Sequence, residues 1–323
     1  MKKDREFLSV FAPYITGLLE EKRAMGFVYD SAEDEFYRLD KYFVEKSITE
    51  PALTKEIIED WCVLHPGEKG YGLQKRIGVI RRLSEYMNSL GFQAYYPRIS
   101  PKVTAALPHI FTSDEIKAVF NSIDTYRPHS HEKAVHRMAQ EYRVLFRLYY
   151  CCGLRNSEGS ELPTDKVDLE NGILTIDSKN KTRLVYLGTD MTELCRKYYD
   201  YLTRELGHSS DYFFPGRYLT APISQTTVDA VFRKFWKMTK FAADCSNPPT
   251  PHDLRFTFIT NRINRWALEG YDIDALMPYL SQYVGHKDVQ ETYYYYHLAD
   301  ELFDVIRKKD KTSAAVIPEA RYE

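Results

Sequence analysis

Apolar residues in the first hundred positions repeat at helical spacing. They recur every three or four residues, the period that places side chains on one face of an α-helix. Further helices are predicted around residues 57–64 and over residues 73–90, where Gly91 ends the helix. Residues 1–100 are therefore predicted to form a helical domain with its own core. The two clearest stripes contain Phe7, Phe11, Ile15, Leu18 and Leu19, and then Phe36, Leu39, Tyr42 and Phe43.

The regular pattern stops after Gly91 and resumes as a second, larger set of helices. The stretch FQAYYPRISPKVTAALPHIFT holds three prolines and little periodicity, so residues 101–112 are predicted to form a linker. A new helix is expected after Thr112 or Ser113 as its N-cap. Residues 113–310 are predicted to form a mostly helical second domain, and residues 311–323 a short mobile tail.

One segment of the second domain has the pattern of β-structure. GILTIDSKNKTRLVYLG contains two runs rich in Ile, Leu, Thr, Val and Tyr around the polar turn Ser-Lys-Asn-Lys, which predicts a β-hairpin. The fold class is therefore predicted to be mainly α with a small β-hairpin or sheet, in two domains.

Composition and charge narrow the class of protein. Apolar residues make up 44% of the chain and charged residues 28%, as in ordinary globular proteins, and no apolar run is long enough to span a membrane. Five scattered cysteines without a CxxC pair favour free thiols in a reducing cytoplasm. The formal net charge of −2 lowers the expectation of nucleic-acid binding unless positive charges cluster.

Basic residues do cluster in the predicted helix over residues 73–90. Lys75, Arg76, Arg81 and Arg82 occur there with no acidic residue before Glu85. A solvated helix face is the commoner explanation of such a run, and a helix that contacts DNA phosphates is the functional one. These four residues are candidate DNA-binding residues.

A histidine and an arginine open another predicted helix, in TPHDLRFTFITNRIN. Thr250 suits the N-cap, Pro251 the first helical position, and Asp253 closes a capping box. His252 and Arg255 then project from one face of the helix N-terminus, where free N–H groups and the helix dipole attract an anion. A helix cap with a surface arginine explains this segment equally well when it is taken alone.

Four consecutive tyrosines follow in GHKDVQETYYYYHL. A turn of about 100° per residue places Val289, Tyr293 and Tyr296 on one stripe, so those two tyrosines are most simply core residues. Tyr294 and Tyr295 point away from that stripe and require another explanation, of which partial exposure is the simplest.

Two further segments carry isolated basic residues. YYCCGLRNSEGSEL is predicted to be an apolar helix that ends at Gly153, with Arg155 at the start of the next helical segment and Glu158 one turn later. The hairpin turn carries Lys179, Lys181 and Arg183, and exposed turn lysines ordinarily have no catalytic role. The histidines of RPHSHEKAVHR do not have HExxH spacing, so no metal site is expected there.

The order of these segments resembles the tyrosine recombinase (phage integrase-like) family. GLRxSE, a hairpin lysine, HxxR, GH and a tyrosine nine residues after that histidine occur in the family's order. The resemblance covers the second domain, and the first domain resembles the family's core-binding domain, which implies a two-domain, C-shaped DNA clamp. The catalytic residues implied by the resemblance are Arg155, Lys179, His252, Arg255, His286 and Tyr295.

Two of these assignments have a rival. Tyr294 is the second choice for the nucleophile. Lys181 competes with Lys179 because the turn is one residue shorter than the family's frequent form, and Lys181 is otherwise a candidate DNA contact.

The residue types suit transfer of a phosphoryl group to tyrosine. Two guanidiniums can hold both non-bridging oxygens of a phosphodiester and offset its negative charge. A phenol has a pKa of about 10, so roughly one part in a thousand is ionised at pH 7. A cationic pocket would favour the ionised form and His252 could accept its proton. No carboxylate cluster suits Mg²⁺, and no cofactor is expected.

The expected function is site-specific DNA recombination through a 3′-phosphotyrosyl intermediate, which would integrate or excise a mobile element in the cytoplasm. The expected partner is double-stranded DNA. The resemblance also implies a tetramer on DNA, held by the C-terminal segment ELFDVIRKK with Leu302, Val305 and Ile306 on its apolar face. Two alternatives stay open, a type IB topoisomerase and a non-enzymatic DNA-binding protein.

Overall fold

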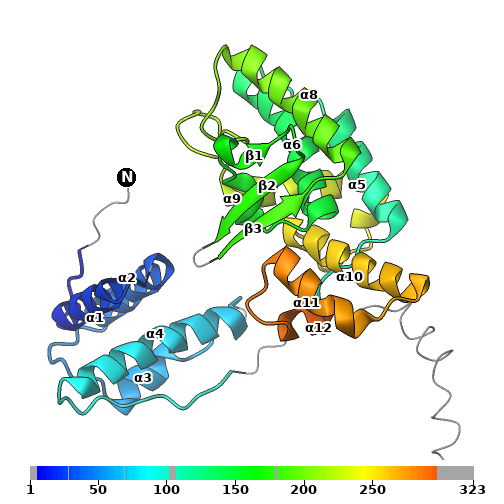
Figure 1. Ribbon diagram of the computed structural model, residues 1–323. Helices are drawn as coiled ribbons and strands as arrows, with labels where there is room; N and C mark the ends of the chain where they lie inside the picture. Colours follow the sequence, from blue (N-terminus) through cyan, green and yellow to red (C-terminus); the bar gives the residue numbers. More distant parts are fainter. Residues whose placement is uncertain (1–5, 28, 69, 102–106, 179–180, 297–323) are drawn as a thin grey trace, which may run out of the picture. The chain divides into compact units, whose positions relative to one another are not determined.

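The computed structural model describes residues 6–27, 29–68, 70–101, 107–178 and 181–296. The chain divides into two compact units, Met1–Ala106 and Leu107–Glu323, and each is described by itself (Figure 1). The boundary falls within the stretch that was predicted to be a linker.

Unit 1 is helical, and its core contains the predicted apolar stripes. Phe11, Ile15, Phe36, Leu39 and Phe43 have no exposed surface. The first helix begins only after Phe11, because Pro13 favours the first turn of a helix, where its missing N–H is not needed. The helices of this unit are α1 (Ala12–Ala24), α2 (Asp30–Glu45), α3 (Lys55–Trp61) and α4 (Gly70–Ser89).

Unit 2 is built around one long buried helix, α6. This helix contacts α5, α7, α8 and α10, and its residues Phe146, Leu148 and Tyr149 are fully buried. Thr112 caps α5, as predicted, by accepting a hydrogen bond from the backbone N–H of Glu115. The helices are α5 (Ser113–Thr125), α6 (Lys133–Cys152), α7 (Asn156–Ser160), α8 (Thr189–Leu206), α9 (Gln225–Lys237), α10 (Pro251–Glu269), α11 (Ile273–Val284) and α12 (Gln290–Tyr296).

The predicted hairpin is confirmed as two strands of a small antiparallel sheet. The strands are β1 (Val167–Asp168), β2 (Ile173–Ser178) and β3 (Lys181–Tyr186), in the order β1-β2-β3. Side chains alternate along β3, so Leu184 is half-exposed whereas Val185 is buried. The same alternation places Arg183 on the inner face, and β3 contacts α11 (Figure 1).

The last helices of unit 2, α10, α11 and α12, share a separate hydrophobic cluster. Ile259, Ile263, Met277 and Val284 are its fully buried members. This cluster fixes the end of α11 beside the start of α10. None of the helices in the described ranges has the length and apolar character needed to cross a membrane.

Candidate active site

The turn between α6 and α7 places the first arginine. Gly153 ends α6 in the left-handed conformation, with φ +65°, as the sequence predicted. A Cβ at Gly153 would lie 2.5 Å from the ring of Phe258, so this turn also requires glycine for close packing. Arg155 follows as the N-cap of α7, and the carboxylate of Glu158 accepts hydrogen bonds from its backbone N–H (2.8 Å) and its Nη1 (2.7 Å).

The start of α10 places the second arginine. The predicted capping box forms, because Thr250 donates from its backbone N–H (2.7 Å) and its Oγ1 (2.8 Å) to the carboxylate of Asp253. Arg255 is buried rather than on the surface, since only 1% of its area is exposed. The alternative of a helix cap with a surface arginine is therefore wrong.

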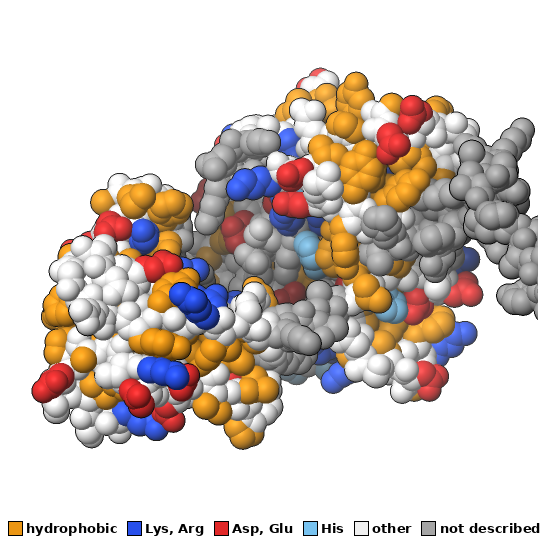
Figure 2. Space-filling view, turned by 90° about the horizontal axis from the view of Figure 1, so that it is seen from below, with side chains coloured by type: hydrophobic (Ala, Val, Ile, Leu, Met, Phe, Trp, Pro, Cys, Tyr) orange, Lys and Arg blue, Asp and Glu red, His pale blue; other side chains and the backbone are white. Residues whose placement is uncertain are grey.

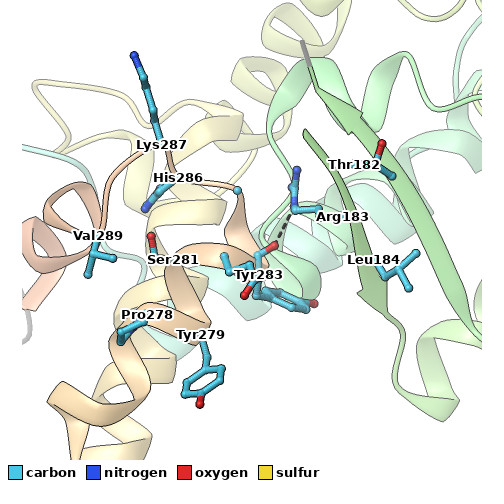
Figure 3. Close-up of a pocket in the computed structure, with 12 residues that line it drawn as sticks. Thr182, Arg183, Leu184, Pro278, Tyr279, Ser281, Tyr283, His286, Lys287 and Val289 are labelled. Atoms are coloured by element: carbon cyan, nitrogen blue, oxygen red, sulfur yellow. Dashed lines mark hydrogen bonds between the residues drawn. The ribbon is translucent and has the colours of Figure 1, made fainter. Parts of the chain in front are cut away.

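The C-terminal end of α11 gathers both arginines and a third, Arg183. Carbonyl groups in the last turn of a helix lack helical donors and carry partial negative charge, so they attract cations. Three successive carbonyls here each accept from a different guanidinium, and Figure 3 shows the bond from Arg183. The pairs are Arg183 Nε with Tyr283 O (2.8 Å), Arg255 Nη2 with Val284 O (2.7 Å), and Arg155 Nη2 with Gly285 O.

A single carboxylate, Glu158, lies among the three guanidiniums. It accepts from Arg155 Nη1 and from both Nη atoms of Arg183, and it lies 4.0 Å from Arg255 Nη1. Burial raises the pKa of Glu158, but the hydrogen bonds and charge of Arg183, followed by those of Arg155, outweigh burial and bring it to about 2. Three positive charges and one negative charge leave the cluster at +2. Such a cluster attracts an anion.

Two neutral histidines border this cluster. Burial, followed by the charges of Arg255 and Arg155, lowers the pKa of His286 to about 3. The Nδ1 of His286 lies 2.7 Å from Thr292 Oγ1, which fixes the ring. His252 packs edge-on against Phe256, and burial followed by the charge of Arg255 lowers its pKa as well. Both imidazoles are therefore uncharged at neutral pH.

Tyr295 lies against the same cluster, with its ring stacked on that of His286 at 5.8 Å between centroids. Only 6% of its surface is exposed, so the prediction that it points away from the core was wrong. The helical-wheel argument assumed one covered face, whereas α10 and α11 cover α12 from two sides. Burial raises the pKa of Tyr295 to about 12, although Arg255 and Arg155 oppose that rise. Tyr294 is 44% exposed, as predicted.

A cavity of about 810 Å³ opens between β3 and α11, next to the arginine cluster. Arg183 and His286 line it together with Leu184 and Tyr279 (Figure 3). Two members of the site, Arg183 and His286, therefore border this cavity. Within the described ranges, no set of histidine, cysteine, aspartate or glutamate side chains has the geometry of a metal site.

A family model described as the phage integrase family matches residues 110–301, which is more than half of the chain. The chain belongs to this family. Tyrosine recombinase XerD of Pasteurella multocida is 27% identical over 248 residues, which span 74% of this chain and 75% of that protein. The putative integrase/recombinase y4rB of Sinorhizobium fredii is 25% identical over 307 residues, which span 91% of this chain and 95% of that protein.

Solved structures share the fold of this phage integrase family member. The Tn1549 transposon integrase in complex with circular intermediate DNA gives a TM-score of 0.63 at 16% identity, covering 92% of this chain and 98% of that one. XerH site-specific recombinase bound to palindromic difH substrate gives a TM-score of 0.60 at 18% identity, and the match covers 87% of this chain and 77% of that one. The predicted fold class is thereby confirmed as mainly helical with a small sheet.

Lys179, to which the family pattern gives the general-acid role, lies outside the described residues. Lys181 is the first residue of β3, and its side chain also lies outside what the structure describes. Three residues beside the cluster had no role at the site predicted from the sequence: Phe256, Thr292, and Arg183, which was noted only as a basic residue of the hairpin. Their sequence signals are weak, because each is an ordinary residue of a strand or helix whose partners lie elsewhere in the chain.

The predicted DNA-binding residues of α4 have different surroundings. Lys75 and Arg82 are exposed and lie seven residues apart, on one helix face. Arg81 donates to the carbonyl oxygens of Pro97 (2.9 Å) and Ile99 (2.6 Å). On the face of unit 1 shown in Figure 2, basic side chains are interspersed with acidic and apolar ones.

The prediction that Arg76 binds DNA was wrong. Its guanidinium is buried and donates to the Glu68 carboxylate (2.8 and 2.6 Å) and to the carbonyl oxygens of Trp61 and Val63. These donors are used inside unit 1, so Arg76 stabilises the connection between α3 and α4.

Proposed function

We propose that this protein is a site-specific DNA recombinase in which Tyr295 attacks a DNA phosphodiester and becomes joined to the strand. One observation carries the proposal: three arginines and Glu158 form a +2 cluster, bordered by two neutral histidines, next to the buried Tyr295 ring. An anion-binding site beside a phenol is what phosphoryl transfer to tyrosine requires.

Arg155 and Arg255 bind the non-bridging oxygens of the scissile phosphate. Both are already held by helix-end carbonyls, so little reorganisation accompanies substrate binding. His286 donates from Nε2 to the same phosphate. That role requires the tautomer in which Thr292 donates its hydroxyl proton to Nδ1.

His252 acts as the base that receives the proton of Tyr295. Its lowered pKa keeps it neutral and able to accept. The phenolate oxygen then forms a bond to phosphorus, and the bond from phosphorus to the 5′ oxygen breaks. The leaving oxygen takes a proton from Lys179, with Lys181 as the rival donor, and becomes a free 5′-hydroxyl.

The covalent link conserves the free energy of the phosphodiester, so another strand's 5′-hydroxyl can reverse the step without ATP. The substrate is a double-stranded recombination site, and several copies of the chain assemble on it. We propose a tetramer held by the segment that contains Leu302, Val305 and Ile306, which lies outside the described residues. The biological task is integration or excision of a mobile element, which the likeness to a transposon integrase supports.

The test is incubation with a nicked suicide duplex that carries DNA flanking the gene. Wild-type protein is expected to form an adduct that survives denaturation, Tyr295→Phe to form none, and the neighbouring Tyr294→Phe to form it normally. A wild type that binds the duplex without forming an adduct would contradict the proposal and favour a non-enzymatic DNA-binding protein. Relaxation of a supercoiled plasmid without exchange between two sites would favour a topoisomerase.

A further inference from the structure

We propose that Arg183 is a positioning residue, which sets the geometry of the phosphate-binding arginines through Glu158 and the end of α11. The proposal rests on the recombinase function above and adds to it a residue to which that function assigns no role. Arg183 lies on β3 opposite Ile176, on the inner face of the hairpin.

Every nitrogen of Arg183 donates within the protein. Its Nε donates to Tyr283 O (2.8 Å), and its Nη1 and Nη2 donate to the two oxygens of Glu158 (2.9 and 2.7 Å). Only 9% of the side chain is exposed. Figure 3 shows it extending from β3 to the end of α11. A side chain held in this way acts through its partners rather than by direct contact with DNA.

The paired hydrogen bonds to Arg183 determine how Glu158 meets Arg155. With both carboxylate oxygens engaged by Arg183, Glu158 accepts only from Nη1 of the Arg155 guanidinium, at 2.7 Å. Without Arg183, Arg155 alone would hold the carboxylate, through its backbone N–H (2.8 Å) and its Nη1 (2.7 Å). The carboxylate could then turn to pair in parallel with the Arg155 guanidinium, the geometry that carboxylate and guanidinium prefer. Glu158 would then compete with the phosphate for the same donors.

Gly285 adds independent support, because the turn that precedes His286 packs directly on these guanidiniums. A Cβ at Gly285 would lie 2.8 Å from Arg183 Nη1 and 3.2 Å from Arg155 Nη1. Displacement of Arg183 would therefore shift the turn that carries His286 as well as the Glu158 carboxylate.

The experiment measures the single-turnover rate of adduct formation at saturating suicide duplex. Arg183→Met is expected to slow the step about 100-fold, the effect of misplacing a reacting group by about 1 Å. Arg183→Lys keeps the positive charge but loses the planar set of donors of the guanidinium. The reduction in its rate should therefore be smaller than that of Arg183→Met. The double variant Arg183→Met/Glu158→Gln should be no slower than Glu158→Gln alone, because the two residues act as one unit.

The pH dependence of the adduct-formation rate distinguishes a positioning role of Arg183 from a loss of folding. The charged and titratable groups that face Glu158 are Arg155, Arg183, Arg255, His252 and Tyr149. Loss of Arg183 removes the strongest influence that keeps the carboxyl ionised. Protonation of the Glu158 carboxyl would end its competition with the phosphate, so the deficit of Arg183→Met, measured against the wild type at the same pH, should shrink as pH falls. The double variant, which has no carboxyl at this position, should show no such recovery.

Arg147→Met is the matched control, because Arg147 pairs with Asp124 away from this cluster and its loss should leave the rate unchanged. If Arg183→Met alone unfolds the protein, the double variant, which removes both charges, still provides the comparison. The inference would be overturned by an Arg183→Met protein that reacts at the wild-type rate. It would also be overturned if the rate reduction of the double variant equalled the combined reductions of the two single variants. A wild type without any adduct would overturn the recombinase function itself.

Discussion

Replacement of His286 by glutamine should change how the stability of unit 2 depends on pH. In the folded protein, burial and then the charges of Arg255 and Arg155 bring the pKa of His286 to about 3. In the unfolded chain its pKa returns to about 6.5. As pH falls, the unfolded chain therefore takes up the proton first. The stability associated with the neutral imidazole is complete above about pH 6.5 and is lost as pH falls toward 3.

The magnitude follows from proton uptake by the unfolded chain alone. Between pH 7 and pH 5, a histidine of ordinary pKa gains most of one proton on unfolding, which lowers the free energy of unfolding by about 2 kcal/mol. This figure holds for any folded pKa well below 5, so it does not require the folded value to be known closely. His286→Gln has no such group and should lose about 2 kcal/mol less than the wild type.

The assay is urea unfolding at pH 7 and pH 5, followed by tryptophan fluorescence. A Trp61→Phe background restricts the signal to Trp236 and Trp266, which both belong to unit 2. His208→Gln is the control for losing an exposed histidine. Equal losses of stability in His286→Gln and in the Trp61→Phe parent would show that His286 is not held neutral among the arginines.

Further outcomes are expected for Thr292, Gly285 and the basic residues of α4. Thr292→Val should slow adduct formation about tenfold and Thr292→Ser should not, because serine retains the hydroxyl that fixes the histidine ring; equal rates would remove Thr292 from the site. Gly285→Ala should lower the free energy of unfolding by more than about 1 kcal/mol, since φ is +69° and Cβ would clash; an unchanged urea midpoint would contradict this. DNA affinity should fall steeply with salt, and Lys75→Ala or Arg82→Ala should each reduce the logarithmic salt slope by about 1. Arg76→Met should instead destabilise unit 1 and leave that slope unchanged; a reduced slope would restore Arg76 as a phosphate contact.

The features that the sequence predicted correctly depend on residues close together in the chain. The capping box from Thr250 to Asp253 spans three residues, and the left-handed end of α6 needs only Gly153. The hairpin likewise follows from alternation on either side of one turn. Each of these features is determined by a few neighbouring residues, so it can be predicted from the sequence alone.

The features that were missed depend on distant partners. Arg183 and Tyr283 are 100 positions apart, and Arg155 and Gly285 are 130 apart, so no local pattern indicates that they meet. Tyr295 was misplaced because a helical wheel cannot show that two other helices cover α12. The family pattern selected Tyr295 independently of periodicity, and the structure places that ring beside His286.

The dependence of three guanidiniums on one helix end makes the length of α11 critical. One extra residue within α11 would rotate its final carbonyls by about 100° and advance them by about 1.5 Å. All three cations would lose the carbonyl oxygens at the end of α11 in a single event, although no arginine had been altered. An equal insertion in the exposed loop near Arg217 would disturb none of them. Loop lengths can therefore be redesigned in this protein, whereas the register of α11 cannot.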